Sequence, residues 1–404
     1  MNKKKHIICV LLITFIFITG CWNKVELSER ALVMGTGIDK GEDGTVKVTI
    51  QVLQPIKKGI PAAGIGGEAT DNAVWVTTST GETLFDAVRN FGMQSGRKLF
   101  FQYNEIIVIG EEVAREGILP LLDFFARDHE LRLNQQVLIA EGEAVDVLNA
   151  THQLEIVPAN AIRDLAMGKD AIGTTVSVTL FDLTGMLANK STSPVATRIE
   201  LFESTESEGN EETEQNGEGE QTNKKLRVTG AAVFREDKLV GFFDKPETRG
   251  LNWILGEVVQ GIIVASSPLN PQEKVSIEII RAGGTITPEF KDGDFSITVM
   301  VDMEGTLGEQ QSRVNLTEEQ RWTSLEKRTE AVIENEIKAA LEKAQKEYKT
   351  DIFGFGDAIY RNYPTQWREI EDNWEEVFSQ MDVNIEVNAK LRRSGITRTP
   401  ITPN

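Results

Sequence analysis

Cys21 is the residue whose chemistry follows most directly from its neighbours. It comes straight after Thr19 and Gly20, two small residues that end an apolar run from Ile7 to Ile18. Its thiol is the only side chain in this segment that can carry a diacylglyceryl group through a thioether bond. The spacing therefore predicts a lipid on Cys21, with acyl chains of the palmitate type, and two such chains are enough for stable anchoring to a membrane.

Residues 1–20 have the features of a bacterial export signal. Lys3, Lys4 and Lys5 form a positive start, and the apolar run that follows has twelve residues. A run of this length suits a signal peptide but falls short of the about 20 residues that span a bilayer. With Cys21, the ending resembles the lipobox of bacterial lipoproteins. The alternative is an uncleaved N-terminal helix with a chance cysteine; we favour cleavage before Cys21 and export of the mature chain.

Few other residues of the mature chain have the chemistry of a catalytic or metal site. Cleavage would remove Cys9 and leave Cys21 as the one cysteine, so no disulfide can form within the chain and no other thiol remains. His129 and His152 are the two histidines of the mature chain, and neither lies at metal-ligand spacing from a second ligand. The sequence therefore predicts neither a metal site nor a catalytic site.

The glycine-rich segments do not match the loops that bind nucleotides. Gly35-Thr36-Gly37 lacks the third glycine and the following helix of a dinucleotide fingerprint, and Gly110-Glu111-Glu112 lacks the lysine of a P-loop. The chain also has no Gly-x-Ser-x-Gly sequence of the kind that presents a serine nucleophile. We therefore expect no cofactor and no enzyme activity.

The charge of the chain excludes some classes of partner. It has 43 basic and 62 acidic residues, a net charge of −19, and loss of the three lysines of the signal would lower this to −22. Phosphate contacts need lysine and arginine, so we expect no nucleic-acid binding. Anionic lipid headgroups would repel such a body, so the lipid on Cys21, rather than a basic face, must hold it at a membrane.

Strand-like and helix-like segments alternate in the first half of the chain. Residues 30–54 predict a β-hairpin, because the turn dipeptide Asp43-Gly44 is followed by strictly alternating apolar residues. Helical periodicity is found at 82–93 and 111–125, and residues 137–140 read as a buried strand. The repeated strand-helix-strand pattern of a parallel sheet is not sustained, so we predict an α+β fold rather than a doubly wound one.

Hairpins and one long amphipathic helix dominate the second half. Turns are predicted at 235–238 and 291–294, between alternating strands. The long helix is predicted from Thr317 to Tyr348, opened by a capping box at Thr317-x-x-Gln320. A coiled-coil partner is conceivable, but we favour a helix lying on an antiparallel sheet that the strand at 383–391 completes.

Two shorter helices are predicted at 355–363 and 366–378. Trp367 and Trp374 lie at helical spacing in the second of them. We expect both indoles to pack against the sheet, and the alternative is that they face a partner protein.

An acidic segment at 203–225 predicts the division of the mature chain. It contains eight glutamates and three glycines but no aliphatic or aromatic side chain, so it cannot bury enough surface to fold. It lacks the aspartate spacing of a calcium loop. We therefore predict an N-terminal domain at 21–202, an acidic linker or loop at 203–225 and a C-terminal domain at 226–404.

Several segments taken in order resemble one protein family. They are Gly20-Cys21-Trp22-Asn23-Lys24-Val25-Glu26-Leu27, Gly35-x-Gly37-Ile38-Asp39, Gly96-Arg97-Lys98-Leu99-Phe100-Phe101, Gly110-Glu111-Glu112-Val113-Ala114-Arg115-Glu116-Gly117, Gly230-Ala231-Ala232-Val233-Phe234, Glu247-Thr248-Arg249-Gly250-Leu251-Asn252-Trp253, Trp367-Arg368-Glu369 and Val387-x-Ala389-Lys390-x-x-x-Ser394-Gly395. The chain thereby resembles the Ger(x)C lipoproteins, the C subunits of spore germinant receptors, from the lipobox to about residue 398. Asn23 stands where the family often has aspartate, and 203–225 reads as an insertion.

The resemblance implies a function that composition alone does not. Such receptors combine integral-membrane A and B subunits with this lipoprotein on the extracytoplasmic face of the spore inner membrane, where the complex responds to small nutrients. The implied role is a non-catalytic subunit required for germination signalling, with an α+β fold in several domains. The alternative from another class is a stand-alone surface lipoprotein that binds a small solute, which predicts two lobes around a hinge.

Overall fold

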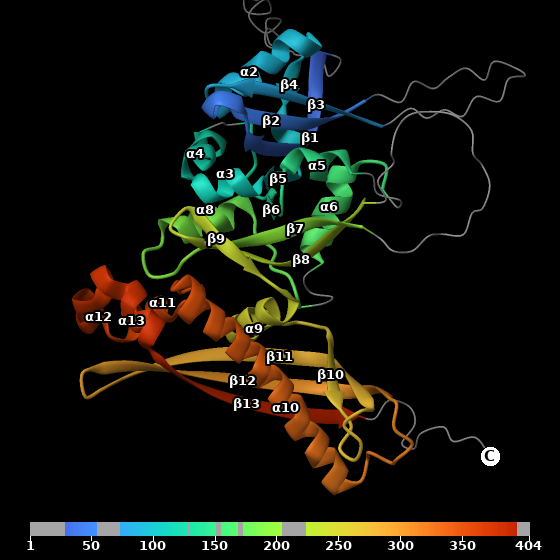
Figure 1. Ribbon diagram of the computed structural model, residues 1–404, viewed down its shortest axis with the longest axis vertical. Coiled ribbons are helices and arrows are strands. Elements are labelled where there is room, and N and C mark those ends of the chain that lie inside the picture. Colours follow the sequence, from blue (N-terminus) through green and yellow to red (C-terminus); the bar gives the residue numbers. More distant parts are fainter. Residues whose placement is uncertain are drawn as a thin grey trace, which may run out of the picture.

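Two β-sheets, one above the other along the long axis, organise the molecule (Figure 1). The computed structural model describes residues 29–54, 73–127, 130–150, 155–168, 173–203 and 224–393. Cys21, His129 and His152 lie outside these ranges, as does nearly all of the acidic segment 203–225.

The first sheet combines parallel and antiparallel strands. Its members are β1 (Arg30–Lys40), β2 (Val46–Leu53), β3 (Val74–Gly81), β4 (Lys98–Phe100), β5 (Ile106–Ile109), β6 (Gln136–Ala140), β7 (Val195–Glu203), β8 (Lys224–Arg235) and β9 (Lys238–Phe243). The order is β3-β2-β1-β5-β6-β7-β8-β9, with β4 paired to β1. Strands β1, β5, β6 and β7 are neighbours and run parallel. Antiparallel strands flank them on both sides, β2 and β3 beside β1, and β8 and β9 beside β7. All residues of β5 and β6 are buried, as expected for parallel strands covered on both faces.

Helices cover both faces of this sheet. They are α2 (Leu84–Ser95), α3 (Glu111–Glu116), α4 (Leu119–Arg127), α5 (Ala144–Asn149), α6 (Pro158–Met167) and α8 (Leu180–Ala188). Side chains of α5 and α6 form one core cluster with the inner strands, whereas α2, α3, α4 and α8 contribute to a second, larger cluster. This mixed arrangement confirms the predicted α+β class.

The second sheet has one covered face. Its strands are β10 (Ile262–Ser266), β11 (Lys274–Lys291), β12 (Asp294–Gln310) and β13 (Asp382–Arg393), in that order, and β13 pairs parallel to β12. Burial alternates along β12, which is the pattern of a half-buried strand. The long helix α10 (Glu319–Glu342) crosses the sheet and continues as a π-helical turn at Lys343–Tyr348 (Figure 1).

The long helix is confirmed, and it lies on the sheet as expected, but its predicted capping box is wrong. The helix begins at Glu319, and its N-cap Glu318 makes no capping hydrogen bond with its side chain. The Thr317 hydroxyl donates instead to Asn315 Oδ1 at 2.7 Å, so a local turn uses the group that the capping box required.

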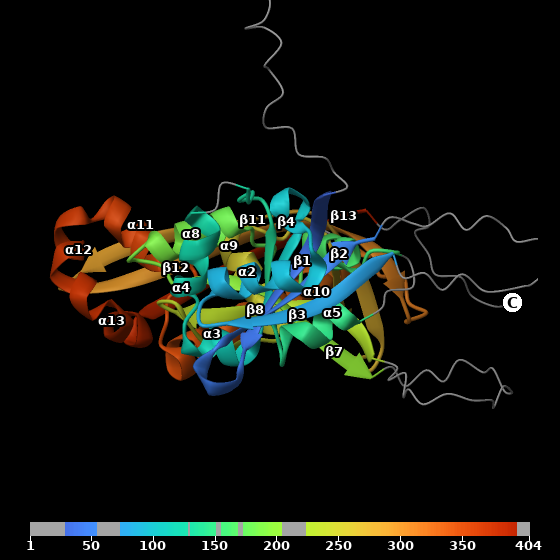
Figure 2. The same ribbon diagram turned by 90° about the horizontal axis from the view of Figure 1, so that it is seen from above.

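Four more helices join or extend the two sheets. Helix α9 (Lys245–Leu255) lies between the sheets, and α11 (Phe355–Asn362), α12 (Pro364–Ile370) and α13 (Trp374–Gln380) gather at one end of the second sheet (Figures 1 and 2). Trp367 and Trp374 are 4% and 7% exposed and their ring centroids are 5.2 Å apart. Both tryptophans are therefore core residues, as expected.

The first sheet extends past the acidic segment. Strand β7 pairs antiparallel with β8, from Val195 opposite Val233 to Glu203 opposite Lys224, and β9 pairs with β8. Residues 204–223 therefore connect two neighbouring strands of one sheet. The chain leaves the first sheet after β9, at Asp244, where α9 begins.

The described ranges contain no helix that is both long enough and apolar enough to cross a membrane.

Candidate interaction site at the junction of the sheets

The segment Gly35-x-Gly37-Ile38-Asp39 has a packing role in β1. The Asp39 carboxylate accepts hydrogen bonds from the N–H groups of Ala144 at 2.6 Å and Val145 at 2.9 Å, at the start of α5. Burial raises the pKa of Asp39, although these backbone hydrogen bonds oppose the rise. A Cβ on Gly37 would lie 2.8 Å from a methyl carbon of Leu148. The glycines thus let α5 approach the sheet closely, and Asp39 fixes its start.

The segment from Glu247 to Trp253 has a different role, because α9 connects the two sheets. Glu336 of α10, 7% exposed, accepts hydrogen bonds from Arg249 Nε at 2.8 Å and Trp253 Nε1 at 2.9 Å. On the opposite side, Asn252 Nδ2 donates to the carbonyls of Gly173 and Thr175, each at 2.9 Å. A single turn of α9 therefore binds the long helix and the residues beside the first sheet.

Glycine is required where α9 crosses α10. A Cβ on Gly250 would lie 2.1 Å from the Glu336 carbonyl oxygen and 2.9 Å from Ala340 Cβ. These distances are below van der Waals contact, so the two helix backbones touch at this point.

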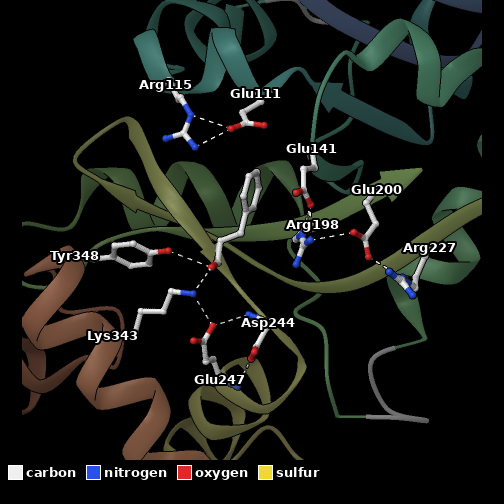
Figure 3. A network of polar contacts seen from close by, with 11 residues as sticks. Glu111, Arg115, Glu141, Arg198, Glu200, Arg227, Asp244, Glu247, Lys343 and Tyr348 are labelled. Carbon is white, nitrogen blue, oxygen red and sulfur yellow. Dashed lines mark hydrogen bonds and ion pairs between the residues drawn. The ribbon is translucent and has the colours of Figure 1, made fainter. Parts of the chain in front are cut away.

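A polar network continues the junction along β9 and the end of α10 (Figure 3). The Phe242 carbonyl accepts from Lys343 Nζ at 2.9 Å and from the Tyr348 hydroxyl at 3.1 Å. Lys343 also binds Glu247 at 2.9 Å, and Glu247 completes a capping box with Asp244 at the start of α9. Side chains of the π-helical turn that follows α10 thereby bind the β9 backbone, and Lys343 links this turn to Glu247 of α9.

A second part of the network lies on the edge of the first sheet. Arg198 on β7 is 16% exposed and pairs with Glu141 and Glu200, and Arg227 on β8 binds Glu200 at 2.7 Å (Figure 3). The Arg198 guanidinium also lies 5.4 Å from the centroid of the Phe242 ring. Alternating charges thus connect β6, β7 and β8 to the strand that carries the junction.

A cleft of about 960 Å³ opens beside this junction. Its walls come from the loop at 189–194, the β8–β9 turn, residues 349 and 351, and the region around α13. Acidic side chains outnumber basic ones in the lining: Glu236, Asp237, Asp351, Glu371, Asp372, Glu375 and Glu376 against Lys190, Arg235 and Lys349. The cleft is therefore an anionic surface between the two halves of the molecule.

Three buried polar atoms of this cleft have no hydrogen-bond partner within the described ranges. They are Thr192 Oγ1, Arg235 Nε and Trp374 Nε1. Arg235 Nε is 3.7 Å from Glu375 Oε2, across the opening between the β8–β9 turn and α13. Buried polar atoms are normally satisfied, so these three are exceptions in the wall of the cleft.

Asp351 is a fully buried acid beside the cleft. Its carboxylate accepts from the N–H groups of Phe353 at 2.9 Å, Gly354 at 3.1 Å and Gly356 at 2.8 Å. Burial nevertheless raises its pKa to about 6, because the low-dielectric surroundings penalise the charged form more than the hydrogen bonds favour it. Asp351 organises the turn into α11, and its charge changes at mildly acidic pH.

The described ranges do not include the cysteine and histidines considered in the sequence, Cys21, His129 and His152. Within those ranges no group of three or more histidine, cysteine, aspartate or glutamate side chains could hold a metal ion. Sequence reasoning missed the cleft, whose walls come from four distant segments. Glu336, an acid on the buried face of the long helix, was a signal for the contact with α9 but not for the cleft.

Comparison with known proteins agrees with this architecture. Residues 23–201 match the family model described as spore germination protein N-terminal domain, and residues 229–395 match the one described as spore germination B3/GerAC like, C-terminal. The chain is 27% identical to spore germination protein KC of Bacillus subtilis (strain 168) over 411 residues, covering 99% of this chain and 98% of that protein.

Two further relatives extend the comparison. Spore germination protein YndF of Bacillus subtilis (strain 168) is 28% identical over 420 residues, covering 97% of this chain and 96% of the relative. The crystal structure of the GerBC protein superposes with a TM-score of 0.56 at 22% identity, covering 88% of this chain and 96% of that one, which shows a shared fold. With both halves matched in order, the chain belongs to the GerAC-like family of spore germination proteins.

Proposed function

We propose that this protein is a lipid-anchored, non-catalytic subunit of a spore nutrient germinant receptor. It would act through contacts with integral-membrane A and B subunits, and the assembled complex would respond to the nutrient. The observation that carries the proposal is the family match over both halves of the chain, which starts at residue 23, two residues after Cys21.

The lipid on Cys21 supplies the membrane attachment in this proposal. The mature chain would be held on the extracytoplasmic face of the spore inner membrane by two acyl chains, which give stable anchoring where one would be marginal. A body held only by a lipid cannot carry a signal across a membrane. It can bias the conformation of embedded partners if it binds one of their states more tightly than the other.

The contacts of α9 weigh against the alternative of a stand-alone solute-binding lipoprotein. That class closes around its ligand by a hinge between two lobes. Here Arg249, Trp253 and Asn252 attach one helix to both sheets through buried hydrogen bonds. A hinge motion at this junction would break several of them, and each unsatisfied buried group costs about 1–3 kcal/mol.

A Cys21→Ala variant in the native organism tests the proposal. We expect the variant to be exported but to lose its lipid, to leave the detergent phase on partitioning, and to lower the rate of nutrient-triggered germination. The wild-type chain expressed from the same locus is the control. Partitioning and germination rates equal to wild type would contradict both the anchor and the receptor role.

A further inference from the structure

An open apolar groove lies between α2 and α4, at the upper end of the molecule in Figure 1. Its volume is about 870 Å³, and its floor includes the buried side chains of Leu99 and Phe101. Phe85 on α2 and Phe124 on α4 both line the groove and pack against each other, with ring centroids 5.9 Å apart. Phe85 is 51% exposed, although aromatic rings of this size are normally covered.

Two arginines beside the groove lack acidic partners. Lys98 binds Glu130 at 2.9 Å and Arg127 binds Asp123 at 2.7 Å, so these cations are neutralised. Arg89 and Arg97 also line the groove, and neither makes an ion pair within the part of the chain that the structure describes. The chain as a whole has a net charge of −19, so an apolar groove with an uncompensated basic rim is an unusual feature of its surface.

The groove also lies close to the proposed anchor. Strand β4, which contributes Lys98 and Leu99 to the groove, pairs in parallel with the first residues of β1, with Arg30 opposite Lys98. Seven residues, 22–28, lie between Cys21 and Glu29, where the described chain begins, so eight residue-to-residue steps join the two. An extended chain of that length reaches at most about 28 Å. If Cys21 carries a lipid, as proposed above, this end of the molecule stays near the membrane surface.

We infer that the groove binds an amphipathic helix of a membrane-embedded partner, with acidic residues along the edge of its apolar face. Phe85, Val88 and Gly92 lie at helical spacing on α2 and form one wall, so the groove is a channel between two helices. Such channels accept the apolar face of a third helix. The acidic edge of the partner would pair with Arg89 and Arg97. The inference rests on the proposed receptor function and assigns a surface to it.

The shape of the groove favours a helix over two other occupants, a small nutrient and a flat bilayer surface. A small nutrient would remain solvated on one side, because the wall residue Phe85 is half exposed, whereas small-molecule sites bury most of their ligand. Leu99 and Phe101 on the floor are 7% and 3% exposed, so a flat bilayer surface would not reach them. A helix inserts its side chains and keeps its own polar face in water.

Gly92 offers a test that leaves the fold intact. A Cβ added there meets no atom within 4 Å, so the side chain of Gly92→Phe can start into open space, and we expect its ring to occupy the groove that Gly92 lines. Gly185 on α8 has the same open surroundings and lies outside the groove, so Gly185→Phe is the matched control. A photo-crosslinking amino acid at Val88, in the full lipidated chain within spore membranes, reports what lies in the groove.

We expect crosslinking to a receptor membrane subunit, at a segment with apolar residues at helical spacing and flanking aspartate or glutamate. The yield should fall about tenfold or more with Gly92→Phe and with the pair Arg89→Glu and Arg97→Glu. It should persist with Gly185→Phe and with the pair Arg89→Lys and Arg97→Lys. Crosslinking to lipid, or equal yields from Gly92→Phe and Gly185→Phe, would overturn the inference.

The same extracts separate this inference from the proposed function. If the membrane subunits copurify with the wild-type chain while groove substitutions change nothing, the groove assignment fails and the receptor role stands. If the subunits do not copurify with the wild-type chain at all, the receptor role and the groove assignment both fail.

Discussion

Two buried acids illustrate how this chain uses carboxylates in its interior. Glu336 is charge-paired with Arg249 and accepts from Trp253, so its partners compensate for burial. Asp351 has no cationic partner among the described residues and accepts hydrogen bonds from three backbone N–H groups. Burial therefore dominates at Asp351 and raises its pKa to about 6.

This raised pKa predicts a pH-dependent stability. Between the ordinary value of 3.8 and about 6, the folded state binds more protons at Asp351 than the unfolded state does. Its contribution to stability is therefore fully present below pH 3.8 and is lost as the pH rises through about 6. A shift of about two units corresponds to on the order of 3 kcal/mol.

The variant Asp351→Asn isolates this effect from the many other acids. We expect the free energy of unfolding of wild type, minus that of the variant, to fall by roughly 2–3 kcal/mol between pH 4 and pH 7. Urea titrations of both proteins at each pH measure the difference. A difference that stays constant with pH would show that Asp351 titrates at its ordinary pKa.

At the scale of elements, the crossing of α9 and α10 depends on Gly250. We expect Gly250→Ala to lower the free energy of unfolding by about 1–3 kcal/mol, because the added Cβ would overlap the Glu336 carbonyl. The matched variant Gly185→Ala, in the open surface of α8, should instead gain up to about 1 kcal/mol from helix propensity. Equal effects of the two substitutions in denaturant titrations would contradict the close crossing.

The acidic segment provides a second prediction about elements. Its flanking residues, Glu203 and Lys224, are already paired across β7 and β8. Deleting residues 206–220 leaves residues 204–205 and 221–223 between the two strands. Connections of this length commonly join neighbouring strands. We expect the free energy of unfolding to change by less than about 1 kcal/mol, since loop length has a weak effect on closure entropy. A loss of more than about 2 kcal/mol would show that the segment is structural.

Elements with a strong local period could be predicted from the sequence. The hairpin of β1 and β2, the long helix α10 and the closing strand β13 were all expected near their observed positions. The alternating residues at 275–279 and 285–290 locally predict two strands, but β11 is one strand. It is continuous because β12 pairs with its backbone through Gly283 and Gly284, where a local pattern suggests a break.

Features that depend on tertiary contacts could not be predicted in this way. Strand β7 was missed, and its partner β8 follows only after the long acidic segment. The junction cleft was missed because its walls come from segments that lie up to about 260 residues apart, with no shared motif. The α2–α4 groove includes the family segment at 96–101, in which Leu99 and Phe101 are buried but Arg97 and Lys98 line an open surface, and the resemblance alone did not indicate this surface.

At the scale of the whole molecule, α9 joins the two sheets of an acidic body for which we propose a lipid anchor at Cys21. The two sheets are held by α9, so a force or contact at one end can be transmitted to the other without an intervening hinge. The α2–α4 groove lies near the start of β1, and the second sheet extends away from it (Figure 1). Such a body is suited to stabilising one arrangement of neighbouring membrane proteins.

Copurification from spore inner membranes is the most direct test of the proposed role as a receptor subunit. The lipidated full-length chain, tagged at its C-terminus and extracted in mild detergent, would be isolated and its partners identified and quantified by mass spectrometry. We expect the integral-membrane A and B subunits to be recovered with the wild-type chain and to be lost with Cys21→Ala. Recovery of the intact, lipidated wild-type chain without either membrane subunit would contradict this role.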